Sequence, residues 1–250
     1  MGTKLQSLQD PIRLVRATIN WYDVALAKLG LRQHPIIRFR NGLSVYYYED
    51  AFSIEHFLER PYDCVNSKGR DVVDIGAYNG DSALYFALQG AKTVYAFEPN
   101  PTLYQIALKN LSLNRFRNIY LFNYGVGPFD HTVKLGDVDP SPSFVLQDLN
   151  EDGVNTVRVR TLRSIVEDFH IDEAVLKLDC EGCEYEVLLN CEDDLFDHFP
   201  EIILEYHNGA EKLVNRLKNY YNIEMRNIKG KVISHNSSFT HLGLLSCQRK

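Results

Sequence analysis

Apolar and polar residues follow two different periods along the chain, and the alternation of these periods predicts its fold. Short apolar runs that end in a glycine or a polar residue are typical of buried strands. They occupy residues 71–76, 93–99, 118–127, 174–180 and 201–207. Stretches with apolar residues at helical spacing lie between them, at residues 82–89, 102–114, 162–170 and 184–196. Strands that alternate with helices in this way predict an α/β fold with a mostly parallel, doubly wound sheet.

Further short elements flank this repeating region. Strands are predicted at residues 43–50, 131–137, 155–161, 222–228 and 241–249, and a short helix at residues 55–60. The last two strands are joined by a polar turn region, so we expect them to form an antiparallel C-terminal edge of the sheet. The chain is therefore expected to comprise an N-terminal extension, residues 1–62, and one α/β domain, residues 63–250.

The extension contains one predicted amphipathic helix, residues 10–30. Asp10 is a suitable N-cap, Pro11 suits the first helical position and Gly30 suits the end of the helix. Two interpretations are open for this helix. It forms a lid or a homodimer contact, or it simply packs on the core.

The composition excludes several classes of function. The 250 residues are 45% hydrophobic and carry a formal net charge of -6, with no long run of lysine and arginine. This balance disfavours a nucleic-acid partner. No apolar run is long enough to span a bilayer, and the N-terminus lacks the apolar core and cleavage site of a signal peptide. We therefore expect a cytoplasmic protein with neither a membrane span nor a nucleic-acid partner.

The five cysteines are odd in number and scattered, which is not typical of a disulfide framework. Cys180 and Cys183 form a C-x-x-C pair, which is compatible with zinc ligation or thiol redox chemistry. A zinc site needs further ligands at matching spacing, and the sequence has no second C-x-x-C. We therefore expect Cys180 and Cys183 to be thiols that neither bind zinc nor take part in redox chemistry.

A glycine-containing loop between the first buried strand and the next helix is the first candidate site. In an open α/β sheet, ligands bind at the carboxyl ends of the strands. Gly76 and Gly80 are separated by three residues, which does not match the G-x-G-x-x-G of a dinucleotide site or the G-K-S/T of a P-loop. Asp74 precedes the first glycine, and a carboxylate there suits a cationic ligand such as S-adenosylmethionine. The expected cofactor-binding residues of this loop are Asp74, Gly76, Ala77, Tyr78, Gly80 and Ser82.

Two strand ends downstream of this loop complete the expected cofactor site. Glu98 follows Gly76 by about 20 residues, the spacing at which an acidic side chain accepts hydrogen bonds from a ribose diol. Asn123 ends the third strand, where it either reaches the adenine edge or is a polar strand-end residue without a ligand.

A second motif, residues 176–188, places several acidic residues at a strand end and at the start of a helix. The helix macrodipole favours carboxylates at such a position, which explains Glu184 better than Asp179. Glu205 and His207 end the next buried strand. In this topology we expect them to lie near Asp179, beside the cofactor loop.

Four sequence blocks together resemble the FkbM family of methyltransferases. They are VVDIGAYNGDSALYFA, FEPNP, RVRTLRSIV, and LKLDCEGCEYEVL followed by IILEYH, and their order and spacing match over roughly residues 65–210. The resemblance implies a Rossmann-like fold, S-adenosylmethionine as the donor, and O-methylation, often of sugar or polyketide hydroxyls. It assigns Asp74, Gly76, Gly80 and Glu98 to the cofactor site, and Asp179 and Glu181 to the signature beside it.

The chain departs from the family pattern at two places. Cys180 and Cys183 stand where the family usually has small or aliphatic residues. The serine-rich loop, residues 140–145, carries an extra proline.

Methyl transfer to an alcohol needs help, because a hydroxyl is a weak nucleophile at neutral pH. The candidate catalytic residues are Asp179, Glu181 and His207. Asp179, Glu205 and His207 could instead hold a divalent ion. Glu205 and His207 share one face of their strand and Tyr206 takes the other, and on that basis no metal is expected.

The expected acceptor is a small-molecule or glycan-linked hydroxyl. The alternatives are methylation of nitrogen or of a nucleic-acid base, and a non-catalytic protein that binds S-adenosylmethionine. A nucleobase enzyme would more often show an N/D-P-P-Y/F strand end and a basic channel, which this sequence lacks.

Overall fold

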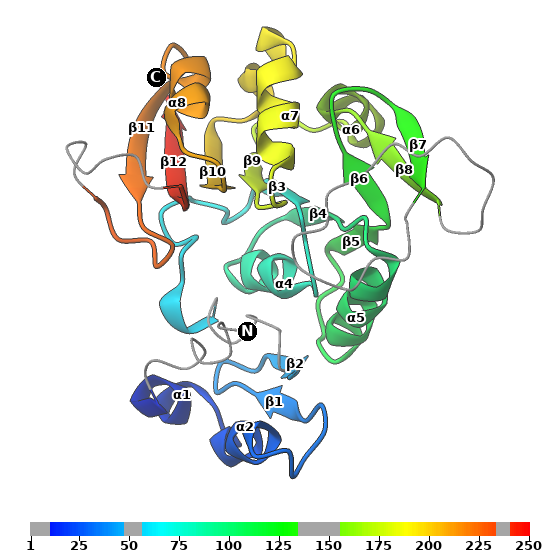
Figure 1. Ribbon diagram of the computed structural model, residues 1–250, viewed down its shortest axis with the longest axis vertical. Helices are drawn as coiled ribbons and strands as arrows, with labels where there is room; N and C mark the ends of the chain where they lie inside the picture. The colour runs from blue at the N-terminus through cyan, green and yellow to red at the C-terminus, as the bar shows by residue number, and fades with distance from the viewer. Residues whose placement is uncertain (1–10, 48–56, 135–155, 234–240) are drawn as a thin grey trace.

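The computed structural model describes residues 11–47, 57–134, 156–233 and 241–250. Its main feature is a seven-stranded sheet with strand order β11-β12-β10-β9-β3-β4-β5. These strands are β3 (Asp71–Ile75), β4 (Thr93–Phe97), β5 (Ile119–Phe122), β9 (Val175–Leu178), β10 (Glu201–Tyr206), β11 (Tyr221–Arg226) and β12 (Gly243–Arg249). The strands from β10 to β5 are parallel, and β12 runs antiparallel to both β10 and β11 (Figure 1). The predicted fold class and its antiparallel C-terminal edge are confirmed.

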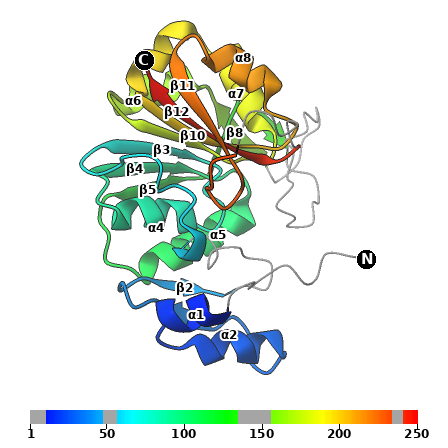
Figure 2. The same cartoon turned by 90° about the vertical axis from the view of Figure 1, so that its left-hand side faces the viewer.

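Helices cover both faces of this sheet (Figure 2). On one face lie α4 (Asp81–Leu88) and α5 (Pro101–Ser112), and on the other lie α6 (Leu162–Phe169), α7 (Cys183–Asn190) and α8 (Glu211–Leu217). Alternate strand residues supply the two cores. Val72 and Val94 pack with the α4 side chains, whereas Val73 and Leu176 pack with those of α6, α7 and α8. Burial on both faces explains why the strands are continuous apolar runs.

Two predicted elements are each divided in the structure. The expected strand at residues 118–127 becomes β5 and β6 (Tyr124–Val126), because β6 leaves the main sheet. It joins β7 (His131–Lys134) and β8 (Thr156–Arg160) in a three-stranded sheet, in which β7 and β8 form the predicted pair. The expected helix at residues 184–196 becomes α7 and the 3-10 helix η1 (Asp193–His198), separated by extended backbone at Cys191. Helix α8 is not among the elements that the sequence pattern predicts.

The N-terminal extension also differs from its prediction. The single expected helix is two helices, α1 (Pro11–Ala17) and α2 (Trp21–Lys28), because the segment between them pairs with the chain beside β1 (Ile36–Arg38). Asn20 secures this break: its side chain donates to the Ile36 carbonyl at 2.8 Å and accepts from the Arg38 amide at 2.8 Å. Such tertiary hydrogen bonds outweigh the local helical periodicity.

The described part of the extension packs on the helices of the α/β domain. Strand β2 (Ser44–Tyr46) pairs with β1, and its Ser44 and Tyr46 amides donate to the side chains of Asn114 and Asn110 near the end of α5. Residues 57–59 of the helix predicted at 55–60 are helical and residue 60 is not, whereas residues 55–56 and the serine-rich loop lie outside the described ranges. The role of the extension as a lid or a homodimer contact stays a prediction.

Candidate active site

The site lies where the strand order turns back, between β3 and β9. Strand β4 lies on one side of β3 and β9 lies on the other. The loops that follow β3 and β9 therefore start side by side and then lead to opposite faces of the sheet. Their backbones touch at Gly76, which has a φ of +79°. A Cβ built there would stand 1.9 Å from the Asp179 carbonyl oxygen, and the Asp179 amide donates to the Ile75 carbonyl at 3.0 Å. A glycine is therefore needed at this position for two reasons: a side chain would clash with the Asp179 backbone, and the backbone has a positive φ.

A buried ion pair holds the two strand ends together. Lys177 of β9 places its Nζ 2.9 Å from Asp74 Oδ1 and donates to the Gly76 carbonyl at 2.6 Å. Ser82 Oγ donates to Asp74 Oδ2 at 2.7 Å. Burial lowers the pKa of Lys177, but the charges of Asp74 and Asp179 outweigh it and raise that pKa above its ordinary value, so the lysine is charged.

Asp74 is the loop residue whose carboxylate we expected to face a cationic ligand. The Asp74 side chain is instead 0% exposed, and its charge is balanced inside the protein by Lys177. Asp74 therefore fixes the geometry of the loop after β3, and its role in cofactor binding stays a prediction. Lys177 is a residue of the site that was not predicted, although a lysine between two leucines of a buried strand is a signal for it.

Glu98 lies at the end of β4, against the loop after β3. Its two carboxylate oxygens accept from the amides of Tyr78 and Asn100, each at 2.8 Å. The pKa of Glu98 is raised to about 7, because the effect of burial is larger than the opposite effect of these two hydrogen bonds. Asn123 donates to the carbonyls of Glu98 and Pro99 at 2.8 and 2.9 Å, so its Nδ2 holds the Glu98 loop in place.

The remaining predicted loop residues shape the turn that leads into α4. Ala77 is fully buried, and its amide donates to the Phe97 carbonyl at 3.0 Å. Gly80 is the N-cap residue of α4 with a φ of 84°, and a Cβ there would meet Leu111 Cδ1 at 2.7 Å. The structure therefore brings the residues from Asp74 to Ser82 into one compact loop beside Glu98.

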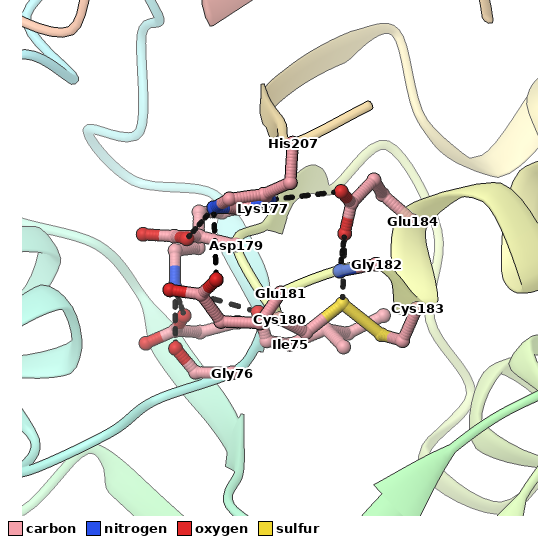
Figure 3. The surroundings of a disulfide bond; sticks show 11 residues. Ile75, Gly76, Lys177, Asp179, Cys180, Glu181, Gly182, Cys183, Glu184 and His207 are labelled. Atoms are coloured by element: carbon pink, nitrogen blue, oxygen red, sulfur yellow. Dashed lines mark hydrogen bonds and ion pairs between the residues drawn. A yellow bond between two sulfur atoms is a disulfide. The ribbon is translucent and has the colours of Figure 1, made fainter. Parts of the chain in front are cut away.

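Four carboxylates surround the imidazole of His207, just beyond the end of β10. Its Nδ1 lies 2.9 Å from Glu184 Oε1. Its Nε2 lies 3.6 Å from Glu181, 3.7 Å from Glu205 and 3.8 Å from Asp179. Figure 3 shows the ring between Glu184 of α7 and the side chains of Asp179 and Glu181. The three predicted catalytic residues are thus brought together.

Electrostatics determine the charge of this imidazole. Burial lowers the pKa of His207, but the hydrogen bond and charge of Glu184, with the charges of Glu181 and Asp179, raise it to about 9. Glu184 is fully buried and also accepts from the Gly182 amide at 2.9 Å, so it caps the start of α7 as well as holding His207. The helix macrodipole alone, on which the prediction for Glu184 rested, does not account for this contact with the histidine.

Cys180 and Cys183 form a disulfide beside this cluster (Figure 3). The expectation of two thiols is therefore wrong. Between them, Glu181 and Gly182 both have positive φ angles, 58° and 122°, and this tight turn brings the two cysteine Cα atoms to 5.4 Å, within the range that a disulfide bridges. Cys64, Cys191 and Cys247 are free thiols.

Residues 74–229, more than half of the chain, match the Methyltransferase FkbM domain family. The chain belongs to the FkbM methyltransferase family. This is the family that its four sequence blocks resemble. The matched range includes both the loop after β3 and the cluster around His207. None of the helices in the described ranges has the length and apolar character needed to cross a membrane.

Individual relatives are more distant. The chain is 30% identical over 128 residues to the ribosomal RNA large subunit methyltransferase K/L of Shewanella loihica. That match covers 48% of this chain and 18% of the relative, so the chain spans less than a fifth of that protein. The crystal structure of methyltransferase FkbM from Methylobacillus flagellatus KT is 19% identical, with a TM-score of 0.47, and the match covers 71% of this chain and 43% of that one.

A further similar structure was determined with a cofactor product. It is TrmK of M. capricolum with S-adenosylhomocysteine, which is 14% identical, with a TM-score of 0.44, and the match covers 72% of this chain and 62% of that one. At these identities and TM-scores, the two structures add nothing to the family match.

Proposed function

We propose that this protein transfers a methyl group from S-adenosylmethionine to a hydroxyl oxygen of a sugar or another small or glycan-linked acceptor, at the cluster around His207. The observation that carries the proposal is the convergence of Asp179, Glu181, Glu205 and His207 beside the cofactor loop. Carboxylates accept hydrogen bonds from hydroxyl groups, so a cluster of this kind suits a polyhydroxylated acceptor.

The charge of the cluster supports a neutral acceptor over a nucleic acid. Four carboxylates and one imidazole leave the cluster negative even when the ring is protonated. Such a surface repels a phosphate backbone, which nucleic-acid binders neutralise with lysine and arginine. Methylation of a nucleobase or of nitrogen is the alternative that the product test below addresses.

The bound cofactor supplies an electrophilic methyl group, and the residues of this chain position the acceptor and take up its proton. In the transfer, the hydroxyl oxygen would take the methyl group from the sulfonium sulfur of the cofactor, and the Asp179 carboxylate would take up the hydroxyl proton. A protonated His207 holds that carboxylate in place. General-base assistance of this kind contributes about 10²–10⁴-fold to a rate.

Glu98 is the proposed ligand of the cofactor ribose. Each of its oxygens accepts one backbone amide, and a carboxylate offers about four acceptor positions, so capacity remains for both hydroxyls of a ribose. The loop from Gly76 to Ser82 forms the other side of this site.

The affinity for S-adenosylmethionine should depend on Glu98 and on pH. At pH 8 we expect Glu98→Ala to weaken binding by about 1–3 kcal/mol, because the ribose hydroxyls lose a charged acceptor. Since the pKa of Glu98 is about 7, protonation below neutral pH should weaken binding to the wild type and leave the variant unaffected. Calorimetry at pH 8 and pH 6 measures both effects, with Glu224→Ala on the distant β11 as the control. Equal affinities in Glu98→Ala and the wild type would remove Glu98 from the ribose role.

The acceptor is tested by identifying the product. Purified enzyme is incubated with methyl-labelled S-adenosylmethionine and a fractionated cell extract, and the labelled product is analysed by mass spectrometry. We expect a methyl ether on a sugar or a related hydroxyl compound. A labelled amine, thiol or nucleobase would refute the oxygen assignment.

A further inference from the structure

Three potential ligand atoms converge at the ends of two neighbouring strands. One ligand atom from each of Asp179, Glu205 and His207 lies within 4.8 Å of the other two. Leu178 of β9 and Leu204 of β10 are paired in register, so Asp179 and Glu205 follow them side by side. Glu205 and His207 lie two residues apart, which directs both side chains to one face. We expected no metal because Glu205 and His207 share one face of the strand. In the structure, that shared face is what allows the three residues to meet.

A buried side chain independently orients the histidine. Glu184 is 0% exposed, and its Oε1 lies 2.9 Å from His207 Nδ1. Its other oxygen accepts from the Gly182 amide, which fixes the carboxylate in turn. With Nδ1 committed to Glu184, the Nε2 atom faces Asp179, Glu181 and Glu205. A carboxylate behind a histidine is the arrangement that sets the tautomer and direction of a metal-ligating imidazole.

The cluster also has an excess of negative charge. Asp179, Glu181, Glu184 and Glu205 surround one imidazole, and the nearby Lys177 forms its ion pair with Asp74. A cation between the three ligand atoms would offset the mutual repulsion of these carboxylates. Glu181 lies at the more exposed side, with 35% of its side chain accessible, and is not needed as a ligand.

We propose that Asp179, Glu205 and His207 bind one divalent cation, and that this cation also binds the acceptor hydroxyl. The second part rests on the proposed function. One nitrogen and two carboxylate ligands suit Mn²⁺, Fe²⁺ or Zn²⁺, and three protein ligands leave positions open for water and an acceptor oxygen. A bound cation lowers the pKa of a coordinated hydroxyl. When the cation is bound, Asp179 and a His207 deprotonated at Nε2 are its ligands instead of the base and its partner, and the hydroxyl proton passes to Glu181 as the methyl group moves from sulfur to oxygen.

The metal is tested directly with Mn²⁺ and chelator-treated wild-type protein, in the absence of cofactor and acceptor. Electron paramagnetic resonance of free Mn²⁺ should report one bound ion per chain. Glu205→Gln and His207→Ala should each weaken binding at least tenfold. Glu184→Gln, which changes no ligand, should weaken it by about 10–100-fold, because it replaces the carboxylate behind His207 with a neutral amide.

Glu186→Gln is the matched control. It makes the same substitution on the exposed side of α7, two residues from Glu184, and should leave Mn²⁺ binding unchanged. Because the wild type is measured directly, misfolding of a variant does not affect the main result. Absence of bound Mn²⁺ in the wild type, or unchanged binding in a folded Glu205→Gln variant, would overturn the proposal.

The metal proposal and the hydroxyl proposal can fail separately. Full methyl transfer to a hydroxyl by protein dialysed against a chelator would overturn the role of the cation and leave the proposed function intact. Stoichiometric Mn²⁺ binding together with a methylated amine as the product would support the metal site and refute the hydroxyl acceptor.

Discussion

Gly76→Ala should reduce the free energy of unfolding by about 3 kcal/mol or more and abolish cofactor binding at ordinary ligand concentrations. The new Cβ would lie 1.9 Å from the Asp179 carbonyl oxygen, which is backbone and has no rotamer to adopt. The residue would also have to keep a φ of +79°, which disfavours any side chain. The loops after β3 and β9 would have to separate, and both halves of the site would be displaced. Urea denaturation and calorimetry measure the two effects.

Gly69→Ala separates the steric effect from the conformational one. Gly69 has a φ of +73°, close to that of Gly76, but a Cβ there meets nothing within 4 Å. The free energy of unfolding of this control should fall by about 1 kcal/mol, which is the cost of an alanine at positive φ. Comparable losses in the two variants would show that backbone conformation, and not the contact with Asp179, determines the need for glycine at position 76.

Replacing Asp179 or His207 by alanine should reduce turnover by about 10²–10⁴-fold while the affinity for S-adenosylmethionine stays within a few-fold. Both side chains belong to the cluster at the ends of β9 and β10, whereas Glu98 and the loop after β3 form the proposed cofactor side. Loss of either residue removes the proton acceptor or its partner, or, when the proposed cation is bound, one of its ligands. Single-turnover methyl transfer, measured alongside cofactor calorimetry, distinguishes an effect on the chemical step from an effect on binding.

Glu186→Ala on the exposed side of α7 serves as the control for these variants and should retain wild-type turnover. Full turnover in both the Asp179 and the His207 variants would leave them with structural roles only. A large loss of cofactor affinity in the Asp179 variant would instead assign that residue to the donor side of the site.

The sequence alone determined the fold class and the family. Parallel strands buried on both faces must be continuous apolar runs, and helices that cover them must repeat apolar residues at helical spacing. Both patterns are local, so they can be recognised without knowing which segments meet. The positions of Gly76, Glu98 and Asp179 at strand ends are local in the same sense, and they indicated the edge of the sheet that carries the site.

Tertiary structure decided which side chains meet there. Asp74 and Lys177 are about a hundred residues apart, and only the β3–β9 pairing places one charge against the other in the core. The contact of Glu184 with His207 and the Cys180–Cys183 disulfide depend on how the chain turns after β9, and the break between α1 and α2 depends on hydrogen bonds of Asn20 to β1. Periodicity reports burial along one segment, whereas these contacts depend on the register and turns that join different segments.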